Sequence, residues 1–362
     1  MGRPEAIPAL TSIRGLAAWW VVLYHFNEMI PEWIPDILLA FIRQGYLAVD
    51  LFFILSGFIL GLNYGERFRN GLAGTAEFYW HRVARIYPLH LAMLMLFLLN
   101  PLALSLFSTS RDIADFPPDY FLMSLLLVQN WGFTTQLAWN VPAWSISTEV
   151  FAYILFPLAA LAIGRWVRST GTVIVGMLAV MVILALAAGM VGGSLGDDIP
   201  RFGLTRCCLE FLLGMLVWRL RALVGFATAP ASAVALLAAA VLCLAYATLP
   251  LRDALVMPAA WTLLVLGLAD RGTGLARLME ARWLELLGLV SYATYLSHFF
   301  IRSWVKFLLL RPGVPEEVAL LAYLILVAIA SILFYRWVEL PGRFWLRNLA
   351  PSGQRQRRPV GR

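Results

Sequence analysis

The sequence predicts an all-α, polytopic membrane protein, and three observations carry that prediction. Hydrophobic residues fill 61% of the 362 positions and charged residues only 14%, whereas a soluble domain has about 25% charged residues. Apolar runs of spanning length recur along the whole chain. Arginines gather in every second connection between these runs, as in a chain threaded repeatedly through a membrane.

The apolar runs predict about ten transmembrane helices and one shorter segment. The expected helices, each bounded to within a few residues, are 10–29, 44–63, 86–107, 141–163, 171–192, 203–218, 228–249, 254–270, 288–310 and 317–337. A shorter apolar run, 120–133, lies between the third and fourth of them. At about 14 residues it is too short to cross a bilayer comfortably, so we expect a re-entrant or interfacial segment.

Arginine placement predicts that both termini are cytoplasmic. The connections expected inside hold Arg67, Arg69, Arg82, Arg85, Arg165, Arg168, Arg219, Arg221, Arg271, Arg277 and Arg282, and the C-terminal region adds Arg343, Arg347, Arg355, Arg357 and Arg358. Those expected outside hold about one arginine each: Arg43, Arg111, Arg201, Arg252 and Arg311. This bias is that of the positive-inside rule. A full crossing by 120–133 would reverse the later arginine pairs and break the pattern.

One integral-membrane domain is expected over residues 1–347, followed by a disordered basic cytoplasmic tail over 348–362 that touches anionic lipid headgroups. The net charge of +7 is almost all arginine, because Lys306 is the only lysine. The arginines lie between the apolar runs, which indicates membrane topology and a lipid partner. Nucleic acid is therefore not an expected partner. The three cysteines show no paired spacing, and we expect neither a disulfide framework nor a metal site.

Two costly side chains lie in the first expected helix. Arg14 and His25 are eleven residues apart, close to three full turns, so they share one face and are separated by roughly 16 Å along the axis. With Arg14 at the cytoplasmic surface, His25 would lie near the midplane. The alternatives are an arginine that snorkels to the interface and an incidental buried histidine.

Further polar groups are expected inside or beside the helices. Asp50 in the second helix needs a partner or a proton, which an ion pair that only fixes packing would also supply. Glu149 opens the fourth helix on one face with Ser145 and Tyr153, as a functional group or as the partner of a buried arginine or histidine. His81 stands beside Arg82.

Arg82 and Arg85 share a helical face because they are three residues apart. Two guanidinium groups at a membrane surface are suited to phosphate groups. Ordinary positive-inside charge would place them there as well.

The ninth expected helix repeats the pattern of the first. Ser291, Tyr295 and His298 follow the i, i+4, i+7 spacing, so they share one face. His298 lies about 16 Å from the start of this range. Two of the four histidines therefore reach one depth from opposite ends of the chain.

Two classes of function fit this pattern. A transferase would take a phosphate-bearing donor from the cytoplasm and use a histidine as general base. A proton-coupled transporter would use the histidines, Asp50 and Glu149 as a relay. Paired broken helices, common in transporters, are not visible, and the Arg82–Arg85 pair has an evident task only in the transferase.

The residues also resemble a known family, the acyltransferase-3 family of bacterial integral-membrane O-acyltransferases. The matching pieces, in order, are the Arg14-x10-His25 pair, "DLFFILSGF" from Asp50, "RVARIYP" from Arg82, "WSISTE" from Trp144 to Glu149, "SYATYLSH" from Ser291 to His298, and "YRWVELP" from Tyr335 to Pro341. No single piece is specific, but six in this order are. The chain resembles the stand-alone type, without the fused extracytoplasmic hydrolase-like domain of some members.

The resemblance implies transfer of an acyl group, usually acetyl, from cytoplasmic coenzyme A to a hydroxyl of a lipid-linked or surface polysaccharide, at the bacterial cytoplasmic (inner) membrane. Arg14 and His25 would be the functional pair, Glu149 an essential polar residue, and Arg82 and Arg85, with His81 beside them, the donor-phosphate site. Asp50, Tyr295 and His298 join the catalytic set with lower weight. No permanently bound cofactor is implied, since acyl-CoA is a substrate. A general-base mechanism and a covalent acyl-histidine both stay open, as do the acceptor, the acyl length and the oligomeric state.

Overall fold

The computed structural model describes residues 7–27, 30–31, 33–107, 115–225, 228–270, 272–309 and 313–349. Within these ranges every regular element is a helix and none is a strand, so the expected all-α class is confirmed. Of the expected basic tail, residues 350–362 lie outside the described residues, as do Arg111, Arg271 and Arg311.

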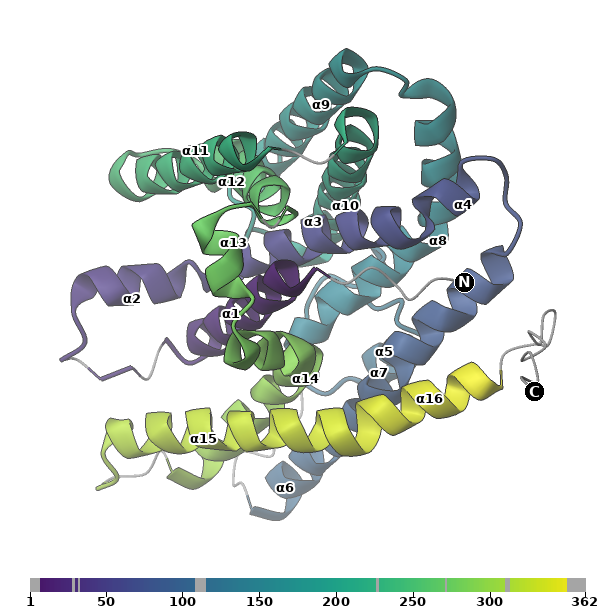
Figure 1. Ribbon diagram of the computed structural model, residues 1–362. Coiled ribbons are helices and arrows are strands. Elements are labelled where there is room, and N and C mark those ends of the chain that lie inside the picture. The colour runs from purple at the N-terminus through teal and green to yellow at the C-terminus, as the bar shows by residue number, and fades with distance from the viewer. Residues whose placement is uncertain are drawn as a thin grey trace, which may run out of the picture.

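The bundle is built from long helices joined by short helical turns (Figure 1). The elements are α1 (Pro8–His25), α2 (Asp36–Arg43), η2 (Gly45–Leu47), α3 (Ala48–Leu60), η3 (Gly61–Gly65), α4 (Glu66–Phe68), α5 (Thr75–Phe97), α6 (Leu99–Phe107), α7 (Pro118–Leu125), η4 (Val141–Ala143), α8 (Trp144–Trp166), α9 (Thr170–Gly189), α10 (Ile199–Val224), α11 (Ala229–Thr248), α12 (Asp253–Leu268), α13 (Gly274–Met279), α14 (Arg282–Leu309), α15 (Glu316–Phe334), η5 (Tyr335–Glu339) and α16 (Leu340–Asn348). In Figure 1, α1, α3 and α14 lie in the middle, α9, α11 and α12 on one side, and α15 with α16 along the opposite edge.

Within the described residues, seven helical stretches are long and apolar enough to cross a membrane. They are Asp36–Phe68, Thr75–Phe107, Val141–Trp166, Thr170–Gly189, Ala229–Thr248, Arg282–Leu309 and Glu316–Asn348. The chain is therefore a multi-pass membrane protein. The other three expected ranges fall on α1, α10 and α12, where buried polar groups or a length of only 16 residues weaken the apolar signal. The count of ten and the cytoplasmic termini stay predictions.

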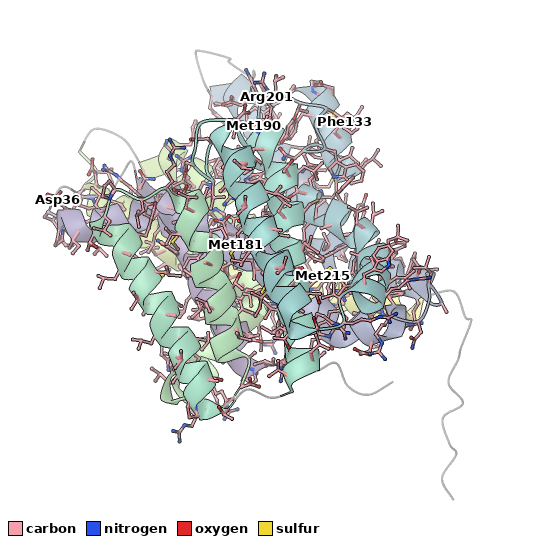
Figure 2. The ribbon with its side chains drawn as sticks, turned by 90° about the horizontal axis from the view of Figure 1, so that it is seen from above. Asp36, Phe133, Met181, Met190, Arg201 and Met215 are labelled. Carbon is pink, nitrogen blue, oxygen red and sulfur yellow. The ribbon has the colours of Figure 1, made fainter. Side chains whose placement is uncertain are left out.

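The segment expected to be re-entrant or interfacial contains a helix of only eight residues, α7. The chain behind it is not helical, and its polar groups turn into the bundle. Gln129 Nε2 donates to Ala143 O at 3.2 Å, and Asn130 donates to Ser147 Oγ at 3.1 Å and to Ile199 O at 3.2 Å. Figure 2 shows Phe133, Met190 and Arg201 gathered at one end of the molecule. A non-helical backbone can persist at membrane depth only when protein covers it in this way.

Helix α1 ends at His25, four residues before the expected end of the first range. The short helix α2, which the sequence did not predict, follows and leaves Ile37 and Phe41 exposed. Phe41 stacks on Trp20 at a centroid distance of 4.7 Å, and its carbonyl accepts from Trp20 Nε1 at 2.8 Å.

Glycines bring the central helices into close contact. A Cβ atom on Gly288 would lie 1.9 Å from Thr11 O, and one on Gly15 would lie 2.5 Å from Gly288 N. The same device joins α3 to α10, where a Cβ on Gly57 would lie 1.9 Å from Phe211 O. Small residues are what allow backbones to approach in a membrane, and here they press α1 against α14, the two helices that carry the predicted histidines.

Candidate active site

Arg14 is held by the neighbouring helix α14. Its Nε donates to Ser291 Oγ at 2.9 Å and its Nη2 to Gly288 O at 2.8 Å. These bonds place Arg14 inside the protein, about one and a half turns beyond the start of α1 at Pro8. Ser291 and a helix carbonyl thus bind the guanidinium, and the depth of Arg14 in the membrane stays a prediction.

His25 and His298 meet at the far end of the same helix pair. His298 Nε2 lies 3.2 Å from His25 Nδ1, and the ring centroids are 4.9 Å apart. His298 is fully buried near the middle of α14. Arg14 and His25 thus both face α14, which confirms their common face, and the expected convergence of the two histidines is also confirmed.

For neutral imidazole rings, the hydrogen-bond partners of the two histidines decide which nitrogen carries the hydrogen. His25 Nδ1 lies 3.0 Å from Val21 O, and His298 Nδ1 lies 2.6 Å from Tyr295 O. A carbonyl oxygen only accepts, so each Nδ1 carries a hydrogen. His298 Nε2 then accepts from the shared His25 Nδ1–H, and His25 Nε2 keeps its lone pair. This leaves one ring nitrogen of the pair ready to accept a proton.

Tyr295 turns away from α1 and toward the start of α8. Its hydroxyl donates to Pro142 O at 3.1 Å and lies 2.7 Å from Ser145 Oγ. Of the three residues expected on one face of α14, Ser291 and His298 contact α1, whereas Tyr295 joins α14 to η4 and α8. Its contacts indicate that it positions the backbone beside His298.

Glu149 lies on the predicted polar face of α8. Its Oε1 accepts from the Tyr153 hydroxyl at 2.7 Å, and that hydroxyl lies 3.4 Å from Ser56 Oγ on α3. Glu149 and Arg14 are also close enough to interact electrostatically. If Glu149 serves as the counter-charge of a buried arginine, that arginine is Arg14.

Arg82 and Arg85 point into the protein from the first half of α5. The Arg82 guanidinium lies over the rings of Tyr64 and Tyr153, at 5.4 and 5.8 Å from their centroids. Arg85 pairs with the buried carboxylate of Glu339 and lies 5.4 Å from the Tyr292 centroid. Planar arginine groups stacked on rings keep their donors directed sideways.

Several charges converge on this inner region. Arg14 interacts electrostatically with Arg85, Glu339 and Glu149, and Arg343 interacts with Arg82, Arg85 and Arg347. We call the set the arginine cluster: Arg14, Arg82, Arg85, Arg343 and Arg347, with the acids Glu149 and Glu339. Five guanidinium groups and two carboxylates give it an excess of positive charge.

Asp50 has a partner at the other end of α3. Arg206 donates to its two oxygens at 2.7 and 2.8 Å, and both residues are almost fully buried. Arg206 also donates to Leu195 O at 2.7 Å. Glu210 and Asp253 lie close enough to interact with Arg206, and we call these four residues the acidic cluster. Asp50 was expected either to act in the reaction or to form an ion pair that fixes helix packing. Its contacts with Arg206 are those of the ion pair.

His25 stands at the end of α1 beside the fully buried His298, and the arginine cluster lies toward the other end of the same helix pair. A histidine with a free lone pair is suited to act as a general base in group transfer to a hydroxyl. The family comparison agrees. The model of an acyltransferase domain matches residues 7–336, nearly the whole chain. The chain belongs to the acyltransferase-3 family.

Two of the three relatives described here are acyltransferases by name. Acyltransferase MdmB of Streptomyces mycarofaciens is 28% identical over 326 residues, covering 83% of this chain and 80% of the relative. O-acetyltransferase OatA of Staphylococcus aureus is 23% identical over 95% of this chain but 58% of its own length. Protein 2 in the picA locus of Rhizobium radiobacter is 30% identical over 51% of this chain. No solved structure matches the chain.

Some of the acyltransferase's buried charges were missed in the sequence. Arg206 and Glu210 lie one turn apart in the expected range 203–218, and charges inside an apolar run are themselves a signal of function or pairing. Glu339 stands in the "YRWVELP" piece, where its pairing with Arg85 needs a contact across 254 residues. In the sequence, Arg343 and Arg347 served only as indicators of membrane topology. Their place in the site follows from the packing of α16 along α5.

Proposed function

We propose that the protein is an acyl-CoA-dependent O-acyltransferase of the bacterial cytoplasmic membrane that acylates a hydroxyl of an extracytoplasmic glycan or lipid-linked sugar. The observation that carries the proposal is the alignment of the arginine cluster with the histidine pair along α1 and α14. Arg14, in the arginine cluster, and His25, in the histidine pair, are roughly 16 Å apart along the axis of α1. An extended pantetheine arm is of comparable length.

The donor would enter from the side of the arginine cluster. Its phosphates are multiply charged anions, which arginine binds with paired donors. Arg82 and Arg85, with His81 beside them, would hold these phosphates, and the arm would lie along α1 and α14 so that the thioester carbonyl reaches His25. Acetyl is the favoured acyl group because O-acetyltransferase OatA is among the relatives.

The lone pair on His25 Nε2 would serve as the general base. The acceptor oxygen bonds to the thioester carbonyl carbon while its proton passes to Nε2, and the C–S bond then breaks. The coenzyme A thiolate leaves and is protonated, so the products are an ester and free coenzyme A. His298 holds the hydrogen on the opposite nitrogen of His25, and the developing imidazolium is stabilised through the shared bond.

The remaining predicted residues take supporting roles in this proposal. Glu149 balances Arg14, Tyr295 fixes the backbone carbonyl that orients His298, and Asp50 anchors Arg206 away from the reacting atoms. A covalent acyl-histidine on the same Nε2 is the competing mechanism. Acid quenching during turnover separates the two, because only the covalent route leaves labelled acyl group on the protein.

The experiment that tests the function uses the purified protein in lipid nanodiscs with acetyl-CoA and a panel of bacterial glycans. We expect free thiol to be released together with a hydroxylamine-sensitive ester on the glycan. Proton-linked solute uptake by vesicles without thiol release would contradict the proposal and support a transporter. Comparison of surface glycans from a deletion strain then identifies the acceptor.

A further inference from the structure

The last helix, α16, continues the line of α15 and lies along α5 (Figure 1). Trp80 Nε1 donates to Leu346 O at 2.6 Å, and a Cβ on Gly342 would lie 2.5 Å from Pro88 Cβ. Residue numbers fall along α5 as they rise along α16, so the two helices are antiparallel. This register sets the arginines of one helix against those of the other.

The register divides the arginines into two levels. The contacts Trp80–Leu346 and Pro88–Gly342 fix a register that sets Arg85 opposite Arg343 and Arg82 near Arg347. His81 interacts most strongly with Arg347. We call Arg85 and Arg343 the inner level, and Arg82 and Arg347 with His81 the outer level. Three or four residues separate the levels on each helix, about 5 to 6 Å.

The outer level has hydrogen-bond donors without acceptors. Arg82 Nε and Arg347 Nε are buried and have no hydrogen-bond partner among the described residues, and the same holds for His81 Nδ1. A buried donor without an acceptor is costly. Arginine cannot relieve repulsion by losing its proton, so converging guanidiniums of this kind fit a multiply charged anion.

The donor carries its phosphates in a fixed order. Starting from the thioester, coenzyme A presents pantetheine, then the diphosphate, then a ribose with a 3′-phosphate. Starting from His25, the protein presents Arg14, then the inner level, then the outer level. The two orders coincide.

We propose that the outer level, with Arg347 as its main contact, binds the 3′-phosphate of the acyl-CoA donor, while the inner level binds the diphosphate. This inference rests on the proposed function. It assigns donor selectivity to α16, whose Arg343 and Arg347 lie beyond residue 336, where the family match ends. Thioesters without the 3′-phosphate would then be poor donors.

The test compares acetyl-CoA with acetyl-3′-dephospho-CoA. The wild-type enzyme is expected to have a KM at least tenfold lower for acetyl-CoA, the size of one charge-assisted contact. Arg347→Gln should raise the KM for acetyl-CoA about tenfold and leave that for the dephospho donor unchanged. Arg85→Gln should raise both, because both donors keep the diphosphate.

Two further variants serve as controls for the loss of an arginine elsewhere and for the loss of charge. Arg336→Gln removes an exposed arginine from the same terminal run and should change neither KM. Arg347→Lys keeps the charge and should restore part of the preference if the role is phosphate binding. If Arg347→Gln raises the KM for both donors by the same factor, the inference is overturned. A wild-type enzyme with equal KM values for the two donors also overturns it. Absence of turnover with either donor overturns the proposed function itself.

Discussion

The arginine cluster and the acidic cluster sit at opposite ends of α3 and handle buried charge differently. Asp50 lies in the first turn of α3, and Tyr64, which lies beneath Arg82, follows 14 residues later, roughly 21 Å along the axis. In the acidic cluster, Asp253 accepts from Tyr46, Ser194 and the Leu195 amide, at 2.7, 2.6 and 3.1 Å. All three of these partners of Asp253 belong to the protein itself.

In the arginine cluster, Arg14 and Arg85 have partners in the protein, whereas Arg82 Nε and Arg347 Nε have none among the described residues. A surplus of carboxyl groups can be relieved by taking up protons, but a surplus of guanidiniums persists at every physiological pH. Excess positive charge inside a membrane protein therefore needs an anion from outside. Glu210 of the acidic cluster also has two buried oxygens without a hydrogen-bond partner among the described residues, but a carboxyl group can take up a proton. The comparison teaches that an unpaired buried guanidinium, which keeps its charge, is the stronger indication of a ligand.

The largest expected effect is that of a substitution at the histidine pair. His25→Ala should lower kcat for acetyl-CoA-dependent transfer by about 10²–10⁴-fold, because it removes the general base. Thiol release by purified protein in nanodiscs measures the loss. His90→Gln is the matched control, since His90 is buried and bonds Ser124 O outside the site. Normal turnover by His25→Ala would refute its role.

The acidic cluster should respond in stability rather than donor binding. Arg206→Met leaves Asp50 buried without its partner and should cost about 3–5 kcal/mol. A thermal unfolding assay in detergent should show a clear fall in melting temperature, and the Asp50→Leu, Arg206→Met double variant should recover most of it. An unchanged melting temperature with a raised donor KM would reverse the assignment of the two clusters.

The contact between α1 and α14 should be sensitive to one methyl group. Gly288→Ala places a Cβ against Thr11 O and should cost about 1–3 kcal/mol by overpacking, with a matching fall in kcat as the histidines separate. Gly189→Ala is the control, because no atom lies within 4 Å of its new Cβ. Equal behaviour of the two variants in unfolding and turnover assays would show that the close approach is unimportant.

The smallest expected effect is that of salt. Raising NaCl from about 0.05 M to about 0.5 M should raise the KM for acetyl-CoA severalfold through screening, and kcat should stay the same. Acetyl-pantetheine, which lacks phosphates, is the control and should show no such dependence. A salt effect of equal size on both donors would exclude the arginine cluster as its source.

Helical periodicity explains which parts of the site the sequence could predict. Arg14 with His25, and Ser291 with His298, lie within single helices, where spacing alone fixes the shared face. The pairing of α1 with α14 then followed from two histidines at one depth.

Contacts between distant helices could not be predicted in this way. The Arg85–Glu339 pair and the packing of α16 on α5 depend on how the last helix returns. The early end of α1 depends on the turn toward α2. The inward placement of Arg14 depends on the Gly288 carbonyl, which no side-chain pattern reveals.

The most direct measurement of the central claim is coenzyme A binding, separated from chemistry. Isothermal titration of the purified protein with coenzyme A should give binding for the wild type and for His25→Ala. The Arg82→Gln, Arg85→Gln double variant should bind at least tenfold more weakly. Equal coenzyme A affinity in the double variant and the wild type would contradict the account.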